Sequence, residues 1–227
     1  MIQHDIEILA CHGWGLQPSF WDRLSRELPE QVQFTGLNRG YFGKPTSRSF
    51  GKGTRKKMLM THSFGLLWCP EELLEAADHL IIFSGFLHFH PGGAEAEKRS
   101  RMVVRQMMGR FIEKPDEVLH KFYETLFYPS ERALSPPVSV DHDLLLDDLN
   151  RIQHDRISIE RFRSIPAFTI FHGGEDAVVP NELGRELYQR LAGRSRYYEV
   201  KQAGHALPFT HSEVCMNFLK PIIGTGI

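Results

Sequence analysis

Short apolar runs alternate with segments of helical periodicity along most of this chain. Short runs that indicate strands, most of them apolar, occupy residues 6–11, 32–37, 57–61, 80–83, 166–171 and 197–200. Apolar residues recur every three or four positions, as in amphipathic helices, over residues 19–28, 181–191 and 212–219. Strands that alternate with helices favour a sheet whose strands run mostly parallel. The pattern therefore predicts an α/β fold, with helices flanking a mostly parallel sheet.

Residues 87–162 depart from this alternation. They contain three long helical patterns with no strand between them, at residues 94–112, 116–127 and 143–154. Segments rich in Gly and Pro punctuate these patterns, as expected for turns. We therefore predict a helical cap at residues 87–162. It interrupts a core whose first part is residues 1–86 and whose second part is residues 163–227.

Composition and charge argue against several classes of protein. The 227 residues are 41% hydrophobic, which suits one domain with a sizeable core. The formal net charge of −1 gives no global field to attract nucleic acid or a membrane. No apolar run approaches the roughly 20 residues of a membrane span, and residues 1–5 lack the pattern of a signal peptide. We expect a cytoplasmic monomer that binds neither nucleic acid nor membrane.

The cysteines and histidines give no metal signature. Cys11, Cys69 and Cys215 are widely spaced and odd in number, which predicts reduced thiols rather than disulfides or zinc ligands. His88 and His90 alternate along the chain, but no third ligand stands at a fixed spacing from them. We expect no metal and no organic cofactor.

Ser63 is the candidate nucleophile, since it follows the apolar run at residues 57–61. With Gly65 it nearly reproduces the G-x-S-x-G nucleophile elbow, a sharp strand-to-helix turn that lifts a serine hydroxyl above a sheet. Thr61 stands at the position of the first glycine, so the motif is imperfect. A serine between a strand and a helix is also often only a helix cap, and Ser63 alone leaves both roles open.

Two distant segments supply an acid and a base in the order Ser, Asp, His. Asp176 lies in a turn after the run at residues 166–171, and His205 follows the run at residues 197–200. Because the carboxyl ends of parallel strands meet at one edge of a sheet, we expect the three side chains to converge there. A histidine oriented by a carboxylate can take the proton of a serine hydroxyl. Glu175 competes for the acid role, for which Asp176 is preferred.

Backbone N–H groups that stabilise a developing oxyanion should come from two loops. One donor is Phe64, the residue after the nucleophile. The second is Trp14, in the glycine-rich turn His12-Gly13-Trp14-Gly15. These features predict a serine hydrolase site at one edge of the sheet.

Three segments resemble the α/β-hydrolase superfamily and, within it, the pimeloyl-[acyl-carrier protein] methyl ester esterases of biotin synthesis. They are residues 9–16, 174–180 and 201–211, which resemble the oxyanion loop with its tryptophan, the acid loop and the histidine loop. The resemblance implies the α/β-hydrolase fold with an inserted helical cap. It also implies a serine carboxylesterase in which Ser63, Asp176 and His205 hydrolyse the methyl ester of a pimeloyl chain on acyl-carrier protein.

The first cap helix carries the clue to the partner. Five cations fall within thirteen positions that hold no acidic residue: Lys98, Arg99, Arg101, Arg105 and Arg110. The opposite stripe, expected to pack on the core or to line an acyl pocket, is Val103, Val104, Met107, Met108 and Phe111. Because the family's cap presents basic residues to acyl-carrier protein, the resemblance implies docking of this partner at Arg99, Arg101, Arg105 and Arg110. A solvated basic face is the alternative. Phe122 is expected to line the acyl channel.

Other functions on the same scaffold stay open at this point. The same triad serves general short-chain carboxylesterases, thioesterases and a lyase of menaquinone synthesis. A non-catalytic binding protein is a further alternative, supported only by the imperfect elbow at Thr61. Analogy of fold does not separate one ester from another.

Overall fold

The computed structural model describes residues 5–191 and 193–224, and within them one sheet of six strands. The strands are β1 (Ile6–Cys11), β2 (Val32–Leu37), β3 (Lys56–His62), β4 (His79–Phe83), β5 (Ala167–Gly173) and β6 (Ser195–Val200). Their order is β2-β1-β3-β4-β5-β6, and each neighbouring pair is parallel. The predicted α/β class is confirmed, and this sheet is parallel throughout.

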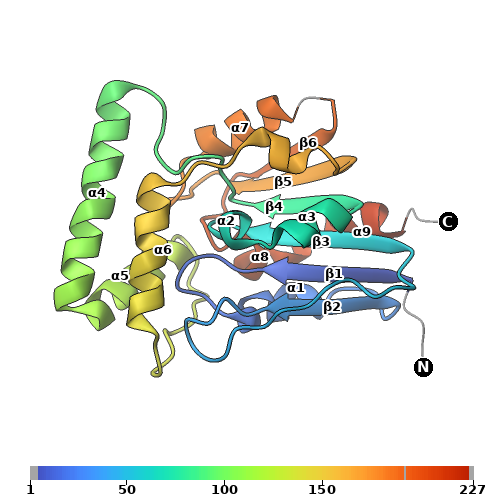
Figure 1. Cartoon of the computed structure of the whole chain (residues 1–227), viewed down its shortest axis with the longest axis horizontal. Coiled ribbons are helices and arrows are strands. Elements are labelled where there is room, and N and C mark those ends of the chain that lie inside the picture. The colour runs from blue at the N-terminus through green and yellow to red at the C-terminus, as the bar shows by residue number, and fades with distance from the viewer. Residues whose placement is uncertain (1–4, 192, 225–227) are drawn as a thin grey trace.

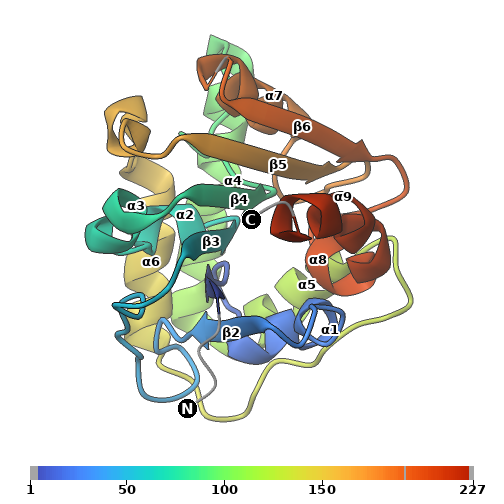
Figure 2. The ribbon, with the colours of Figure 1, turned by 90° about the vertical axis from the view of Figure 1, so that its right-hand side faces the viewer.

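Alternate side chains of the strands enter two apolar cores, one on each face of the sheet. Ile8 and Met60 join the core beneath α1 (Asp22–Ser25), α8 (Leu207–Thr210) and α9 (Ser212–Gly224). Leu9 and Leu59 join the core beneath α2 (Gly65–Trp68), α3 (Glu71–Ala76) and α7 (Asn181–Arg190). Figure 2 shows α3 on one side of the sheet and α1, α8 and α9 on the other. Because both faces are covered, the inner strands β1, β3, β4 and β5 contain continuous apolar runs, whereas the edge strands β2 and β6 are more polar.

Three long helices lie between β4 and β5 in the chain: α4 (Ala94–Glu113), α5 (Pro115–Phe127) and α6 (His142–His154). Figure 1 shows α4, α5 and α6 together beyond the carboxyl ends of the strands. Leu119 and Leu145 extend one core, and Tyr123 and Leu126 extend the other. The inserted helices are therefore packed into the same cores as the sheet. A short 3-10 helix, Ile159–Phe162, leads back to β5.

The predicted helix at residues 19–28 is wrong in its type and length. The structure has a 3-10 helix at Pro18–Trp21, and α1 after it ends at Ser25. The N–H groups of Glu27 and Leu28 bond carbonyls only three residues back, so the turns tighten ahead of Pro29. The apolar spacing could not distinguish this tightened path from an α-helix.

Three further predictions concern a signal peptide, a long loop and membrane spans. Residues 1–4, which bear on the expected lack of a signal peptide, are among those not described. Residues 38–53, predicted as loop, form neither helix nor strand. In the described ranges, no helix has both the length and the apolar character that crossing a membrane requires.

Candidate active site

Ser63 lies at a strained turn directly after β3. Its φ angle of 53° is in the left-handed region, which a residue with a side chain rarely adopts. The Ser63 N–H donates to the carbonyl of Phe83 at 2.9 Å, which anchors the turn to β4. Helix α2 begins two residues later, at Gly65. This conformation lifts the Ser63 side chain above the edge of the sheet, as a nucleophile elbow does.

The surroundings of Thr61 and Gly65, two residues before and two residues after Ser63, explain why the turn forms without the first glycine of the motif. A Cβ atom at Gly65 would lie 2.3 Å from the carbonyl oxygen of Cys11, so a side chain cannot fit there. Thr61 instead lies inside β3, fully buried between Cys11 of β1 and Ile82 of β4. The close approach that requires a glycine is therefore at Gly65, and the elbow forms with a threonine in the preceding strand.

Asp176 and His205 come together through a direct hydrogen bond. His205 Nδ1 lies 2.7 Å from Asp176 Oδ2. The other carboxylate oxygen, Oδ1, accepts the N–H groups of Val178 at 2.9 Å and Val179 at 2.8 Å. The Asp176 side chain is 0% exposed, whereas the competing acid Glu175 is exposed. The residue that meets the histidine is thus Asp176.

Two neighbouring histidines keep the Asp176 carboxylate ionised. Burial by itself would raise its pKa, but the neighbouring His205 and His172 outweigh burial and hold the pKa well below the usual range of an aspartate. His172 Nε2 donates to the Val179 carbonyl at 2.9 Å and lies 3.4 Å from Asp176 Oδ2. An ionised Asp176 selects the His205 tautomer with a proton on Nδ1, which leaves Nε2 as the ring atom able to accept one.

Ser63 lies at the same edge of the sheet, and its neighbour His62 contacts His205. The rings of His62 and His205 are 4.7 Å apart, and His62 Nε2 donates to the His205 carbonyl at 3.0 Å. Burial holds the pKa of His62 well below its usual value, so this ring is neutral. Among the described residues, the Ser63 side chain makes no hydrogen bond, to His205 or to any other group.

The loop that carries Trp14 lies directly against the elbow. A Cβ atom at Gly13 would be 2.7 Å from His62 Nδ1 and 3.2 Å from Ser63 Cβ. The Tyr123 hydroxyl donates to the Gly15 carbonyl at 2.7 Å and so fixes the far end of this loop. Phe64, the other predicted oxyanion donor, is buried at the start of α2. The two sequence-predicted donors therefore flank Ser63.

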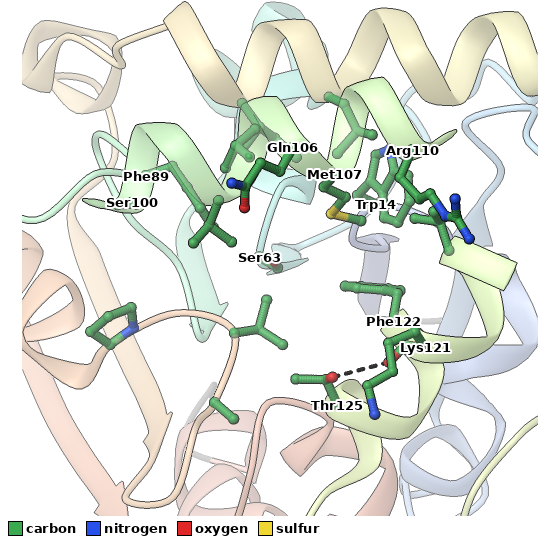
Figure 3. A pocket seen from close by; sticks show the side chains of 18 of the residues that line it. Trp14, Ser63, Phe89, Ser100, Gln106, Met107, Arg110, Lys121, Phe122 and Thr125 are labelled. Carbon is green, nitrogen blue, oxygen red and sulfur yellow. Dashed lines mark hydrogen bonds between the residues drawn. The ribbon is translucent and has the colours of Figure 1, made fainter. Parts of the chain in front are cut away.

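Ser63 opens into a cavity of about 730 Å³ between the sheet edge and the inserted helices. Figure 3 shows Ser63 at its floor, with Met107 of α4 and Phe122 of α5 in its walls. The Phe122 ring meets Trp14 edge-on, with 4.8 Å between the ring centres. Most of the wall is apolar: Trp14, Phe86, Phe89, Val103, Val104, Met107, Val118, Phe122, Leu149, Ile152 and Val178. Such a wall suits an aliphatic acyl chain.

The four arginines predicted to dock a partner are placed differently from one another. Arg99 and Arg105 are exposed on α4. Arg101 turns inward, donating to Glu97 at 2.9 Å and to the Gln153 carbonyl at 2.7 Å. Arg110 lies on the cavity wall and pairs with Glu117 at 2.8 Å. On the opposite stripe of α4, Val103, Val104 and Met107 line the cavity and Phe111 is buried, as predicted.

His88 and His90 take part in packing rather than in a ligand cluster. His90 Nδ1 lies 2.8 Å from the Ser100 hydroxyl, and the rings of His88 and His90 meet edge-on at 5.2 Å. Within the described residues, no three His, Cys, Asp or Glu side chains gather as a metal ion would require.

Several cavity residues escaped the sequence reasoning. Leu149 and Ile152 of α6, together with Ala177, Val178 and Pro180 after Asp176, line the cavity. The i, i+3 spacing of Leu149 and Ile152 could have placed them on the buried face of their helix. Ala177, Val178 and Pro180 directly follow Asp176 in the sequence, and this position next to the candidate acid could have indicated that they line the cavity.

No protein-family model and no curated protein matches the sequence. Solved structures do match. An esterase from Exiguobacterium antarcticum is similar over 97% of this chain and 92% of its own, with 16% identity and a TM-score of 0.74. A hydrolase from Oleispira antarctica is similar over 98% and 92%, with 12% identity and a TM-score of 0.77. A bromoperoxidase from Bacillus anthracis is similar over 95% and 92%, with 16% identity and a TM-score of 0.74.

Structural similarity at sequence identities this low shows the fold alone, so the activity has to be argued from the site. The similarity extends over nearly the whole length of this chain, including its parallel sheet and the helices inserted after β4, and over nearly the whole length of these neighbours. The chain has the α/β-hydrolase fold.

Proposed function

We propose that this protein is a serine carboxylesterase in which Ser63, Asp176 and His205 form the catalytic triad. The observation that carries the proposal is the buried 2.7 Å bond between His205 Nδ1 and Asp176 Oδ2, at the sheet edge where the strained Ser63 opens into an apolar cavity. The esterases among the structural neighbours give further support.

In the first half of the reaction, Ser63 Oγ attacks the ester carbonyl carbon while His205 Nε2 takes its proton. Asp176 orients the ring and stabilises the imidazolium that forms. The carbonyl oxygen becomes an oxyanion, which the backbone N–H groups of Trp14 and Phe64 bind. Collapse of this intermediate breaks the ester C–O bond. The imidazolium then gives its proton to the leaving alcohol, and the acyl group stays on Ser63.

In the second half, water replaces the alcohol. His205 Nε2 accepts a proton from this water, whose oxygen attacks the acyl carbon of the Ser63 ester. A second oxyanion forms at the same two N–H groups. Its collapse returns the proton to Ser63 Oγ and releases the carboxylic acid. Atoms and charges balance with water as the sole co-reactant.

The proposed substrate is the methyl ester of a pimeloyl chain carried on acyl-carrier protein, with methanol as the leaving group. Three features support this choice. The oxyanion, acid and histidine loops resemble those of the esterases that perform this reaction in biotin synthesis. The cavity wall is apolar over most of its area. Cations stand on α4 above it, and acyl-carrier proteins are acidic partners.

The carrier is proposed to meet the exposed face of α4. Lys98, Arg99 and Arg105 are exposed there and are the cations available to an acidic surface. Arg101 and Arg110 already bond Glu97 and Glu117, so they would first have to exchange partners. The docking proposal therefore rests chiefly on Arg99 and Arg105.

The test uses pimeloyl-carrier-protein methyl ester, with loss of the methyl group followed by mass spectrometry. Wild-type protein is expected to demethylate it, and Ser63→Ala is expected to be inactive while remaining folded. A wild-type protein that cleaves 4-nitrophenyl butyrate but not the carrier-bound ester keeps the triad and contradicts this substrate. It would favour a general short-chain esterase instead.

Docking is tested separately with charge reversals. Arg99→Glu combined with Arg105→Glu is expected to raise KM for the carrier-bound ester about tenfold and to leave 4-nitrophenyl butyrate unaffected. Arg190→Glu combined with Lys220→Glu reverses two exposed cations on α7 and α9 and serves as the matched control. Equal effects of the two pairs contradict docking at α4.

A further inference from the structure

One face of α6 reaches both residues proposed as oxyanion donors. Leu145, Asp148 and Arg151 are spaced three apart and therefore lie along one side of the helix. The Leu145 carbonyl accepts the indole N–H of Trp14 at 2.8 Å. The Arg151 guanidinium lies over the Phe64 ring, 5.3 Å from its centre. An inserted helix thus contacts the two loops that flank Ser63.

Asp148 lies between these two contacts and is the buried anchor of α6. Its side chain is 0% exposed. Arg39 donates to both carboxylate oxygens, from Nε at 2.8 Å and from Nη2 at 2.9 Å, and the Tyr41 hydroxyl donates at 2.6 Å. A two-pronged guanidinium–carboxylate pair fixes direction as well as distance. Asp148 therefore locks α6 to the loop that follows β2.

Arg39 also contacts the oxyanion loop, residues 9–16, and so links this loop to Asp148. Its backbone N–H donates to His12 Nε2 at 3.1 Å. His12 directly precedes Gly13, and its carbonyl accepts the Trp68 indole N–H at 2.7 Å. His12 is thus held from two sides, and Trp14 is held by Leu145. The segment His12–Trp14 is therefore connected to α6 at both ends, through Arg39 to Asp148 and directly to Leu145.

We propose that Asp148 is a positioning residue for the oxyanion hole, holding α6 and the loop after β2 so that the N–H groups of Trp14 and Phe64 face the reacting carbonyl. The proposal rests on the esterase function proposed above. Asp148 is not part of the cavity wall, so it acts through Arg39, Tyr41 and Leu145 rather than on the substrate. Displacing oxyanion donors slows the chemical step more than it weakens binding of the ground state.

The test compares Asp148→Asn and the milder Tyr41→Phe with a matched control. The control is Glu7→Gln, which alters another buried carboxylate, one that bonds Gly51 and Thr54 near the amino end of β1. For each folded variant, kcat and KM are measured with 4-nitrophenyl butyrate. Inhibition is measured with an alkyl trifluoromethyl ketone, whose adduct with Ser63 places an alkoxide in the oxyanion hole.

Asp148→Asn is expected to lower kcat by roughly tenfold to a hundredfold with KM within about twofold, and to weaken the ketone by a similar factor. Tyr41→Phe should shift both values in the same direction by less, and Glu7→Gln should leave them unchanged. If Asp148→Asn does not fold, Tyr41→Phe decides. Unchanged kcat and ketone affinity in the folded variants would overturn the positioning role. A wild-type protein with no activity on any ester would instead overturn the proposed function.

Discussion

At the scale of single residues, the candidate site depends on a few contacts that fix how the side chains around Ser63 are oriented. The left-handed φ of Ser63 raises its side chain, and the 2.7 Å bond to Asp176 orients His205. Asp176 in turn is held by two backbone N–H groups and is accompanied by His172. Each contact fixes a direction, which is what proton transfer between serine and histidine requires.

Asp176→Asn tests the role of the acid. An asparagine cannot stabilise the imidazolium and favours the wrong tautomer of His205, so kcat with 4-nitrophenyl butyrate should fall by about 10⁴. Circular dichroism should still show a folded protein. Glu175→Gln is the matched control, since Glu175 is the exposed neighbour, and its kcat should stay unchanged. A comparable loss in both variants would contradict the assignment.

Gly204 is predicted to accept a side chain only if the neighbouring backbone shifts. A Cβ atom there would lie 1.7 Å from the Tyr128 carbonyl oxygen, so the histidine loop or the end of α5 must shift. Gly204→Ala should lower the free energy of unfolding by about 1–3 kcal/mol, measured by urea denaturation. Gly109→Ala, on α4 with no atom within 4 Å of the new Cβ, should be neutral or stabilising. Equal stability of the two variants would refute the close contact.

The three residues proposed as the triad could be selected from the sequence because each follows a predicted strand that ends at the same edge. The sequence could not reveal which other residues hold the site in place. His172 looks like part of strand β5 in the sequence, and its contact with Asp176 depends on the turn of the acid loop. Asp148 is one turn from Leu145 and from Ile152, which places it on the buried face of α6, but its partners Arg39 and Tyr41 lie more than 100 positions away.

At the scale of elements, α4 combines a cavity face and an exposed face. Val104 and Met107 line the cavity, whereas Met102 is 51% exposed on the other side of the helix. Figure 3 shows Met107 above Ser63, between Gln106 and Trp14. The helical periodicity of the sequence predicted this division, since an amphipathic stripe marks the side that packs. It could not predict how far the helix stands from the sheet.

Met107→Trp is predicted to shorten the acyl chains that the cavity accepts. The larger side chain would fill space above Ser63, so kcat/KM for 4-nitrophenyl octanoate should fall by about tenfold or more, while the acetate ester is little changed. Met102→Trp adds the same bulk outside the cavity and should affect neither ester. Equal losses on both esters in Met107→Trp would contradict the location of the acyl channel.

At the scale of the whole molecule, several buried histidines make stability depend on pH. Burial lowers the pKa of His12 to about 4, and it holds that of His62 well below its usual value. Both are neutral in the folded protein, whereas in the unfolded chain they protonate near pH 6.5. The unfolded state therefore binds more protons between pH 6.5 and 4, and stability falls as the pH is lowered through this range.

This dependence is measurable by urea denaturation at pH 7 and pH 5. A histidine with the shift of His12 should lower the free energy of unfolding by about 2 kcal/mol over that interval. The loss should be smaller by about that amount in His12→Gln, because glutamine does not titrate. His120→Gln, at an exposed position of α5, should match the wild type. An unchanged pH dependence in His12→Gln would contradict a neutral, buried His12.

The sheet, the elbow and the inserted helices together form the site that we propose to be that of a serine esterase. Labelling with a fluorophosphonate, followed by mass spectrometry of the peptides, tests it most directly. We expect one adduct, on Ser63, that is absent in Ser63→Ala and formed far more slowly in His205→Ala. A folded wild-type protein that gains no adduct, or gains it at another residue, would show that Ser63 is not an activated nucleophile.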